Sequence, residues 1–329
     1  MAFGIALLLV PGGALACDGE PCDTRFLFEE AREVRLASGG YLREVSGLTR
    51  FAEHLWAVTD KSDAAIYRLD LARREEGVTA VEVPLDIPPP IRQALKACGA
   101  HRGDRLDLED IAVDAEGLFF LLSENYRAIL MARVTDPRGG HPRAAAEDVL
   151  CLPGRNHTAN DGLEGLAAVS GTLYALEEGR GQPTRTFYRC PLPERRCHAV
   201  PFPAQTGRTP GLTPGDPDGT RFLALNMSWE LGKGFRRVCE VRTGDPAAGV
   251  CVLDLDQVKE DAKGRTGFPD SFRQPGGANY EGIHFDRATG RLYVINDNNA
   301  AWNRIFTGDA EYEPTLLLIF TLRASGSSP

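Results

Sequence analysis

The segment Gly162-Leu-Glu164-Gly-Leu-Ala-Ala168 has two near copies elsewhere in this chain of 329 residues. They are Asp107-Leu-Glu109-Asp-Ile-Ala-Val113 and Asn279-Tyr-Glu281-Gly-Ile-His-Phe285, and each places one carboxylate in an apolar run. A fourth copy, Val45-Ser46-Gly-Leu48, has serine in place of the glutamate. Repeats of this kind indicate an array of similar structural units, and function is expected at the repeated polar position.

Each copy is followed by a second apolar run that ends in an acid. These acids are Asp60, Glu124, Glu177 and Asp297. Further strand-like runs follow, so that each unit has the four antiparallel strands of a propeller blade. The repeated position recurs at Ser46, Glu109, Glu164, near Pro210 and at Glu281, at intervals of 63, 55, 46 and 71 residues.

Five units fit this spacing, so the sequence predicts an all-β fold, a single five-bladed β-propeller. The last unit ends in the apolar run Thr315–Leu322. We expect Glu33–Ala37, near the other end of the chain, to complete that unit as its outer strand. Closure by the N- and C-terminal strands would cover sheet edges that otherwise promote aggregation.

The composition excludes some classes of partner. The chain is 43% hydrophobic, its formal net charge is -9, and it has no basic stripe, so we expect no nucleic-acid binding. No later apolar run is long enough to span a membrane. We expect a monomer that binds a small anionic or phosphorylated ligand.

The N-terminus has the features of an export signal. An apolar run from Phe3 to Val10 precedes Ala14-Leu-Ala16, a pattern typical of signal-peptide cleavage. We therefore predict a signal peptide at 1–16, a propeller domain at 17–323, a disordered tail at 324–329, and a periplasmic or secreted location. Lipid anchoring through Cys17 is a less favoured alternative, because Ala14 stands where a leucine is usual.

The chain has eight cysteines, an even number that suggests disulfides in an exported protein. Cys190 and Cys197 flank a plausible hairpin turn. Our preferred pairing is Cys17–Cys22, Cys98–Cys151, Cys190–Cys197 and Cys239–Cys251.

Several segments, taken in order, resemble a bacterial family known for "esterase-like activity of phytase". They are Ser46-Gly-Leu48, Leu108-Glu109-Asp-Ile-Ala112, Asn160-Asp-Gly-Leu-Glu164-Gly-Leu-Ala167, Asp218-Gly-Thr-Arg-Phe-Leu-Ala-Leu225, Gly234-Phe-Arg-Arg-Val238, Asn279-Tyr-Glu281-Gly-Ile283 and Asn296-Asp-Asn-Asn299. The resemblance runs from about Val45 to Leu322 and implies a propeller with hydrolase activity. No G-x-S-x-G motif of a serine hydrolase accompanies it.

The chain is also similar to the five-bladed calcium-dependent apyrases, whose central calcium is held by Ser, Glu, Glu, Ser and Glu in chain order. This resemblance implies Ca²⁺ ligands at Ser46, Glu109, Glu164 and Glu281. The fourth repeat departs from the pattern, because Pro210 holds the position; Thr209, Thr213 or a water could substitute.

The residues themselves support a cation at this position. Three carboxylates that share a narrow channel require neutralisation, and Ca²⁺ accepts mixed oxygen ligands. The alternative is that these glutamate side chains accept hydrogen bonds from backbone N–H groups of the neighbouring blade.

The acids at the ends of the second strands, Asp60, Glu124, Glu177 and Asp297, are expected to rim one mouth of the channel. Basic residues follow them, and Lys61, Arg127 and Arg304 are the candidates to stabilise charge on a phosphate. In the alternative interpretation, acids and bases merely pair on a solvated rim. Two functions therefore compete: a Ca²⁺-dependent phosphoesterase, and a non-catalytic ligand-binding or scaffold propeller with a structural cation.

Overall fold

The computed structural model describes residues 22–71, 77–99, 104–154, 162–177, 186–202, 207–228, 234–244, 249–261, 279–298 and 314–323. The predicted signal peptide and the predicted tail lie outside these residues. Strands dominate the described chain, and two helices accompany them, α1 (Pro89–Ala97) and α2 (Leu255–Asp261). The all-β prediction is confirmed.

The strands form antiparallel groups of four that follow one another along the chain. The groups are β2 (Val45–Phe51), β3 (His54–Thr59), β4 (Ala65–Asp70) and β5 (Val78–Asp86); β6 (Leu108–Val113), β7 (Leu118–Ser123), β8 (Ala128–Thr135) and β9 (Arg143–Cys151); β10 (Leu163–Val169), β11 (Thr172–Glu177), β12 (Thr186–Pro191) and β13 (His198–Pro201); β14 (Leu212–Pro214), β15 (Arg221–Met227), β16 (Arg236–Arg242) and β17 (Val250–Asp254); and β18 (Asn279–Asp286), β19 (Arg291–Asp297), β20 (Leu316–Leu322) and β1 (Phe26–Leu36).

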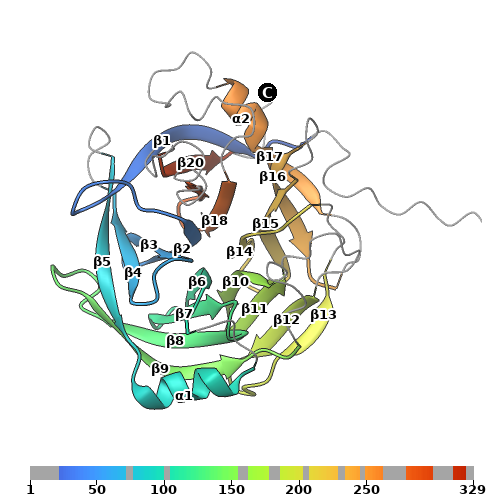
Figure 1. Cartoon of the computed structure of the whole chain (residues 1–329). Coiled ribbons are helices and arrows are strands. Elements are labelled where there is room, and N and C mark those ends of the chain that lie inside the picture. The colour runs from blue at the N-terminus through green and yellow to red at the C-terminus, as the bar shows by residue number, and fades with distance from the viewer. Residues whose placement is uncertain are drawn as a thin grey trace, which may run out of the picture.

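The groups are arranged around a central axis, with the first strand of each innermost (Figure 1). This is the arrangement of a β-propeller. Strand β1 joins the last group by antiparallel pairing with β20, from Phe26↔Leu322 to Glu33↔Leu316. The two ends of the chain therefore share one group, as the sequence predicts. The residues in register with β20 are Phe26–Glu33, so only the first residue of the predicted segment Glu33–Ala37 takes part, and Val34–Leu36 pair with β5 instead.

Outer strands also pair between groups, a feature that the sequence does not indicate. Strand β1 pairs with β5 in parallel through Val34↔Val78 and its neighbours, and β5 pairs with β9 in parallel through Leu85↔Ala144. These short contacts join three of the groups into one sheet of 12 strands.

Apolar side chains fill the spaces between adjacent groups. Between the β2–β5 and β6–β9 groups, the fully buried Trp56 packs edge-on against Phe119, with ring centroids 5.0 Å apart. Phe187 and Phe222 make a similar contact at 5.7 Å between the next two groups. Alternation along each strand supplies such side chains to both faces, so each group is held by its neighbours. No helix in the described ranges is long and apolar enough to cross a bilayer.

Two of the predicted disulfides are present, Cys98–Cys151 and Cys190–Cys197. The predicted pairs Cys17–Cys22 and Cys239–Cys251 are wrong, because Cys22 is bonded to Cys251. The physical reason is that the chain before β1 lies along β17: the amides of Asp23 and Arg25 donate to the carbonyls of Cys251 and Val252. Cys239 is also disulfide-bonded, and Cys17 lies outside the described residues.

Candidate functional site

The repeated polar residues share one backbone irregularity. The pairing of the first two strands shifts register between Val45 and Gly47, Leu108 and Asp110, Leu163 and Gly165, and Tyr280 and Gly282. The residues passed over by these shifts are Ser46, Glu109, Glu164 and Glu281. A β-bulge leaves one residue out of the ladder and re-aims its side chain. The sequence identified the positions, and the bulges explain why their side chains depart from strand alternation.

The residue after each bulge brings neighbouring inner strands close together. A Cβ added at Gly47 would lie 2.5 Å from the Cα of Asp110, and one at Gly282 would lie 3.1 Å from the carbonyl carbon of Gly47. The distance at Gly47 is shorter than real Cβ contacts, and a Cβ at Gly282 would also lie 2.5 Å from Cγ2 of Ile295, so both positions favour glycine. A cavity of about 140 Å³ lies between the inner strands, and Leu48 and Ile111 are among the residues that line it.

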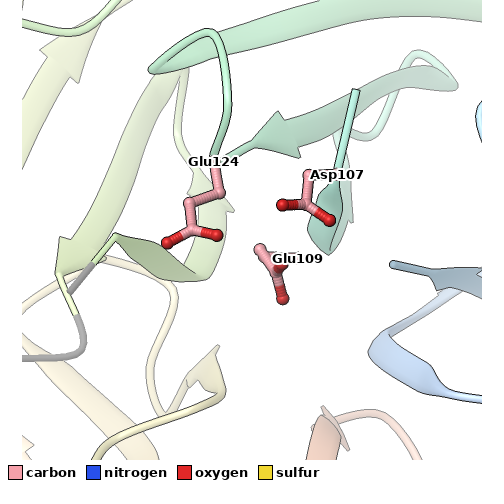
Figure 2. A group of neighbouring side chains, drawn as sticks. All are labelled: Asp107, Glu109 and Glu124. Atoms are coloured by element: carbon pink, nitrogen blue, oxygen red, sulfur yellow. The ribbon is translucent and has the colours of Figure 1, made fainter. Parts of the chain in front are cut away.

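Three carboxylates converge at the start of β6 and the end of β7. Asp107, Glu109 and Glu124 each offer an oxygen within 4.8 Å of the others, and Figure 2 shows the three groups lying close to one another. Asp107 has a left-handed backbone, with φ of 54°. Glu124 packs over Gly162, where an added Cβ would lie 1.9 Å from Oε1 and 2.1 Å from Cγ. The missing side chain at Gly162 therefore leaves the space that Glu124 occupies.

Burial makes charge on this cluster costly. It raises the pKa of Glu109 well above its ordinary value, and nearby Glu164, Asp60, Glu124 and Asp107 raise it further. Burial also raises the pKa of Asp107, against the opposing effect of Arg105 and Lys61. Asp107 and Glu124 share a side-chain hydrogen bond, which two ionised carboxylates cannot make without a proton. The cluster therefore has to hold either protons or a cation.

Ser46 has a different partner. Its buried hydroxyl donates to the carbonyl of Leu108 at 2.6 Å and so ties β2 to β6. This bond to a backbone carbonyl differs from the alternative interpretation, in which the glutamates accept from backbone N–H groups.

Glu164 and Glu281 both form ion pairs with Arg208. Nη2 of Arg208 lies 3.0 Å from Oε1 of Glu281 and 3.5 Å from Oε2 of Glu164. Nδ2 of Asn279 donates to the same oxygen of Glu281 at 2.6 Å and to Asp297 at 3.1 Å. The side chains of Arg208, Glu164 and Glu281 are only 11%, 10% and 12% exposed, so this is a largely desolvated ion cluster.

Sequence reasoning missed Arg208. In the fourth repeat it considered Thr209, Pro210 and Thr213; Thr213 accepts from the amide of Phe285 at 3.1 Å, and Thr209 is fully buried. Arg208 stands two residues before the repeated position. The other repeats have Glu44, Asp107, Gly162 and Asn279 at the equivalent place. Three of these four residues are polar, and this signal could have identified Arg208.

The predicted rim residues have their own pairings. Nζ of Lys61 lies 2.8 Å from Glu44 and also contacts Asp60, yet the Lys61 side chain remains 45% exposed. Arg127, by contrast, is 4% exposed and donates to Glu177 at 2.6 Å. Arg304 lies outside the described residues. Of the three predicted catalytic cations, Lys61 is therefore the one shown to face solvent.

A second cavity lies at the other end of the inner strands. It has a volume of about 920 Å³ and is lined by the β2–β3 and β6–β7 turns, including Phe51, Glu53 and Asp114. The acidic cluster is at the opposite ends of these strands, so this cavity is separate from it.

Asp60 should give the protein an unusual pH response. Burial raises its pKa from 3.8 to about 6, against the opposing effect of Lys61. The folded state then binds this proton more tightly than the unfolded state, so stability falls as pH rises from 3.8 to 6. In the presence of a chelator, we expect Asp60→Asn to stabilise the protein at pH 7 by up to about 3 kcal/mol.

Asp216 provides the control. Its hydroxyl, amide and guanidinium partners at Thr220 and Arg221 outweigh burial and lower its pKa to about 2. Asp216→Asn should therefore destabilise at pH 7, with the difference fading as pH falls toward 2. Urea unfolding of both variants between pH 4 and 8 checks the pair. Effects of the same sign at pH 7 would contradict this assignment.

Comparison with known proteins gives a family and some remote structural neighbours. A family model described as "Phytase-like: Esterase-like activity of phytase" matches residues 41–300. A search of curated proteins found no match.

Solved structures with a similar chain path include Staphylococcus aureus virginiamycin B lyase (11% identity, TM-score 0.39, 85% of this chain and 66% of that chain) and Streptomyces coelicolor aldose sugar dehydrogenase (13%, 0.43, 92% and 100%). The WD40 repeats of RRP9 are another (9%, 0.44, 91% and 100%). The chain spans about two thirds of the first structures that it matches, 66% of the lyase and 65% of Kuenenia stuttgartiensis hydrazine synthase.

Proposed function

Because the chain belongs to the phytase-like family, we propose that it is an exported, Ca²⁺-dependent hydrolase of ester bonds that acts on small phosphate esters. We further propose that the groups of four strands are the blades of a five-bladed propeller. The observation that carries the proposal is the convergence of Asp107, Glu109 and Glu124 within 4.8 Å.

These three carboxylates fit a calcium ion. Calcium prefers oxygen ligands, and carboxylates are the strongest of these in proteins. Gly162 leaves the space that Glu124 occupies, and the burial of Glu109 beside other carboxylates favours a cation that neutralises the cluster. A bound Ca²⁺ would supply Lewis-acid polarisation of a phosphoryl or carbonyl oxygen.

Two rim residues would act on the substrate. The exposed ammonium of Lys61 would attract a phosphate group to the cluster of Asp107, Glu109 and Glu124. Asp60, with its pKa raised to about 6, would accept a proton from an attacking water near neutral pH. Oδ1 of Asp60 is buried and has no hydrogen-bond partner among the described residues, so an acceptor without a partner in this part of the chain lies beside the exposed Lys61.

A substrate screen tests the activity. Phosphomonoesters, phytate, nucleotides and carboxylic esters should be assayed with Ca²⁺ and with chelator. We expect hydrolysis of at least one phosphate ester, a loss of it on chelation, and an increase in KM for Lys61→Met. Arg133→Met is the matched control, because Arg133 lies in an exposed pair with Glu147 on β8 and β9.

The non-catalytic alternative has one observation in its favour. The buried pair of Arg127 with Glu177 is structural, although the sequence offered Arg127 for catalysis. No hydrolysis of any of these esters, together with calcium-dependent stability, would favour a ligand-binding or scaffold propeller.

Calcium should stabilise the fold in either case. A ligand that binds only the folded state adds RT ln(1 + [L]/Kd), about 2.7 kcal/mol at a concentration of about 100 times Kd. We expect chelation to lower the melting temperature and added Ca²⁺ to restore it, with Mg²⁺ less effective. Differential scanning calorimetry checks this. A melting temperature indifferent to both chelator and calcium would contradict the calcium proposal and leave the fold unaffected.

A further inference from the structure

Arg208 lies beside residues of the calcium ring that the sequence predicts. Its Nη2 contacts Glu281 at 3.0 Å and Glu164 at 3.5 Å, and these are two of the four residues of the predicted ring. A third, Ser46, donates its hydroxyl to Leu108. The ring of Ser46, Glu109, Glu164 and Glu281 therefore does not fit a single calcium ion, because Arg208 already neutralises one side of it.

We propose that the guanidinium of Arg208 takes the place of a metal ion. It occupies a position where Glu164, Glu281 and Asn279 would otherwise bind calcium. Arginine suits this role because it stays charged at any relevant pH and can bridge two carboxylates with its planar donors. In the unmodified protein, an inorganic cation would then bind only at the cluster of Asp107, Glu109 and Glu124.

Backbone hydrogen bonds hold Arg208 in a fixed position. The amide of Arg208 donates to the carbonyl of Met227 at 2.7 Å, and the amide of Met227 donates back at 2.9 Å, so the residue is fixed to the end of β15. Gly207, just before it, has φ of 82°, and a Cβ there would lie 2.1 Å from the carbonyl oxygen of Met227. Only glycine allows this approach, which places Arg208 beside Glu164 and Glu281.

The set of Glu164, Glu281 and Asn279 has the chemistry of a calcium site. Glu164 and Glu281 supply carboxylate oxygens, and Asn279 has its Oδ1 3.5 Å from Nη1 of Arg208. All three are largely buried, so removal of the guanidinium leaves two carboxylates in a poorly solvated space. Such a space is neutralised either by proton uptake or by a hard cation with oxygen ligands.

Arg208→Met tests the inference, because methionine keeps an unbranched side chain of similar bulk and removes the charge. Equilibrium dialysis should show that this variant binds one more Ca²⁺ per chain than the unmodified protein. Its melting temperature should fall in chelator and recover more than that of the unmodified protein when Ca²⁺ is added. Arg208→Lys is the control, and it should bind no additional ion.

An unchanged calcium stoichiometry in folded Arg208→Met would overturn the inference. If that variant does not fold, Glu164→Gln in the otherwise unmodified protein decides the question. We expect it to leave the number of bound Ca²⁺ ions unchanged, and loss of an ion would show that Glu164 is already a metal ligand.

This inference is independent of the proposed function. If the unmodified protein binds no calcium and hydrolyses no ester, the proposed function fails. A rise from none to one bound ion in Arg208→Met would still support the role of Arg208.

Discussion

Replacement of both Cys22 and Cys251 by alanine is expected to lower the free energy of unfolding by between about 2 and about 5 kcal/mol. This disulfide joins residues that are 229 positions apart. A crosslink over so long a loop removes much conformational entropy from the unfolded chain, and the removal grows with loop length. The bond also fixes the start of β1 to β17, beside the amides that pair the two segments.

The matched control is the removal of Cys190 and Cys197, which are only 7 positions apart. The same entropic argument gives a loss about half as large for this short loop. Urea unfolding of both double variants under oxidising conditions measures the difference. Equal losses would show that loop entropy does not govern the contribution of these bonds.

Glu109→Gln is expected to abolish calcium-induced stabilisation and to reduce Ca²⁺-dependent hydrolysis by at least about 100-fold. Even residues that only support a metal ligand change affinity or activity by about 10–100-fold, so a direct ligand should exceed this. In chelator, where no calcium is bound, Glu109→Gln should instead raise the free energy of unfolding. Burial raises the pKa of Glu109, and the neutral amide removes the cost of a charge there.

Glu116→Gln is the control for this variant. Glu116 is exposed in the β6–β7 turn, at the end of β6 opposite Glu109. It should change neither the calcium response nor hydrolysis. Calorimetry with and without Ca²⁺, combined with the ester assay, separates the outcomes. A Glu109→Gln protein that still gains stability from calcium would remove Glu109 from the set of proposed ligands.

Much of the architecture follows from local sequence patterns. The short apolar runs set the strands, and the turns between them are short enough to force antiparallel neighbours. The repeat around Glu109, Glu164 and Glu281 placed these residues on inner strands. It could not show the bulges, because a bulge changes pairing register without changing which residues are apolar.

The parts that sequence reasoning missed depend on contacts between distant segments. Cys22 pairs with Cys251 because the chain before β1 lies along β17, and nothing in the residues around Cys22 encodes that path. Arg208 was not predicted because a proline holds the repeated position, and the nearest residues with oxygen ligands are Thr209 and Thr213. The repeat of polar residues two positions earlier was the available signal, and it required comparison of all the repeats at once.

The parallel pairings of β1 with β5 and of β5 with β9 have a mechanical consequence. They form a hydrogen-bonded belt along part of the circumference, across the β18–β1, β2–β5 and β6–β9 groups. In the described chain the β10–β13 and β14–β17 groups are separate sheets, but the β14–β17 group is tied to the segment before β1 by two backbone hydrogen bonds and by the Cys22–Cys251 disulfide. The ring is therefore unevenly stiff. We expect any separation of the inner strands to concentrate at the borders of the β10–β13 group, on the flank of Glu164, while the flank of Asp107 and Glu109 moves as one body.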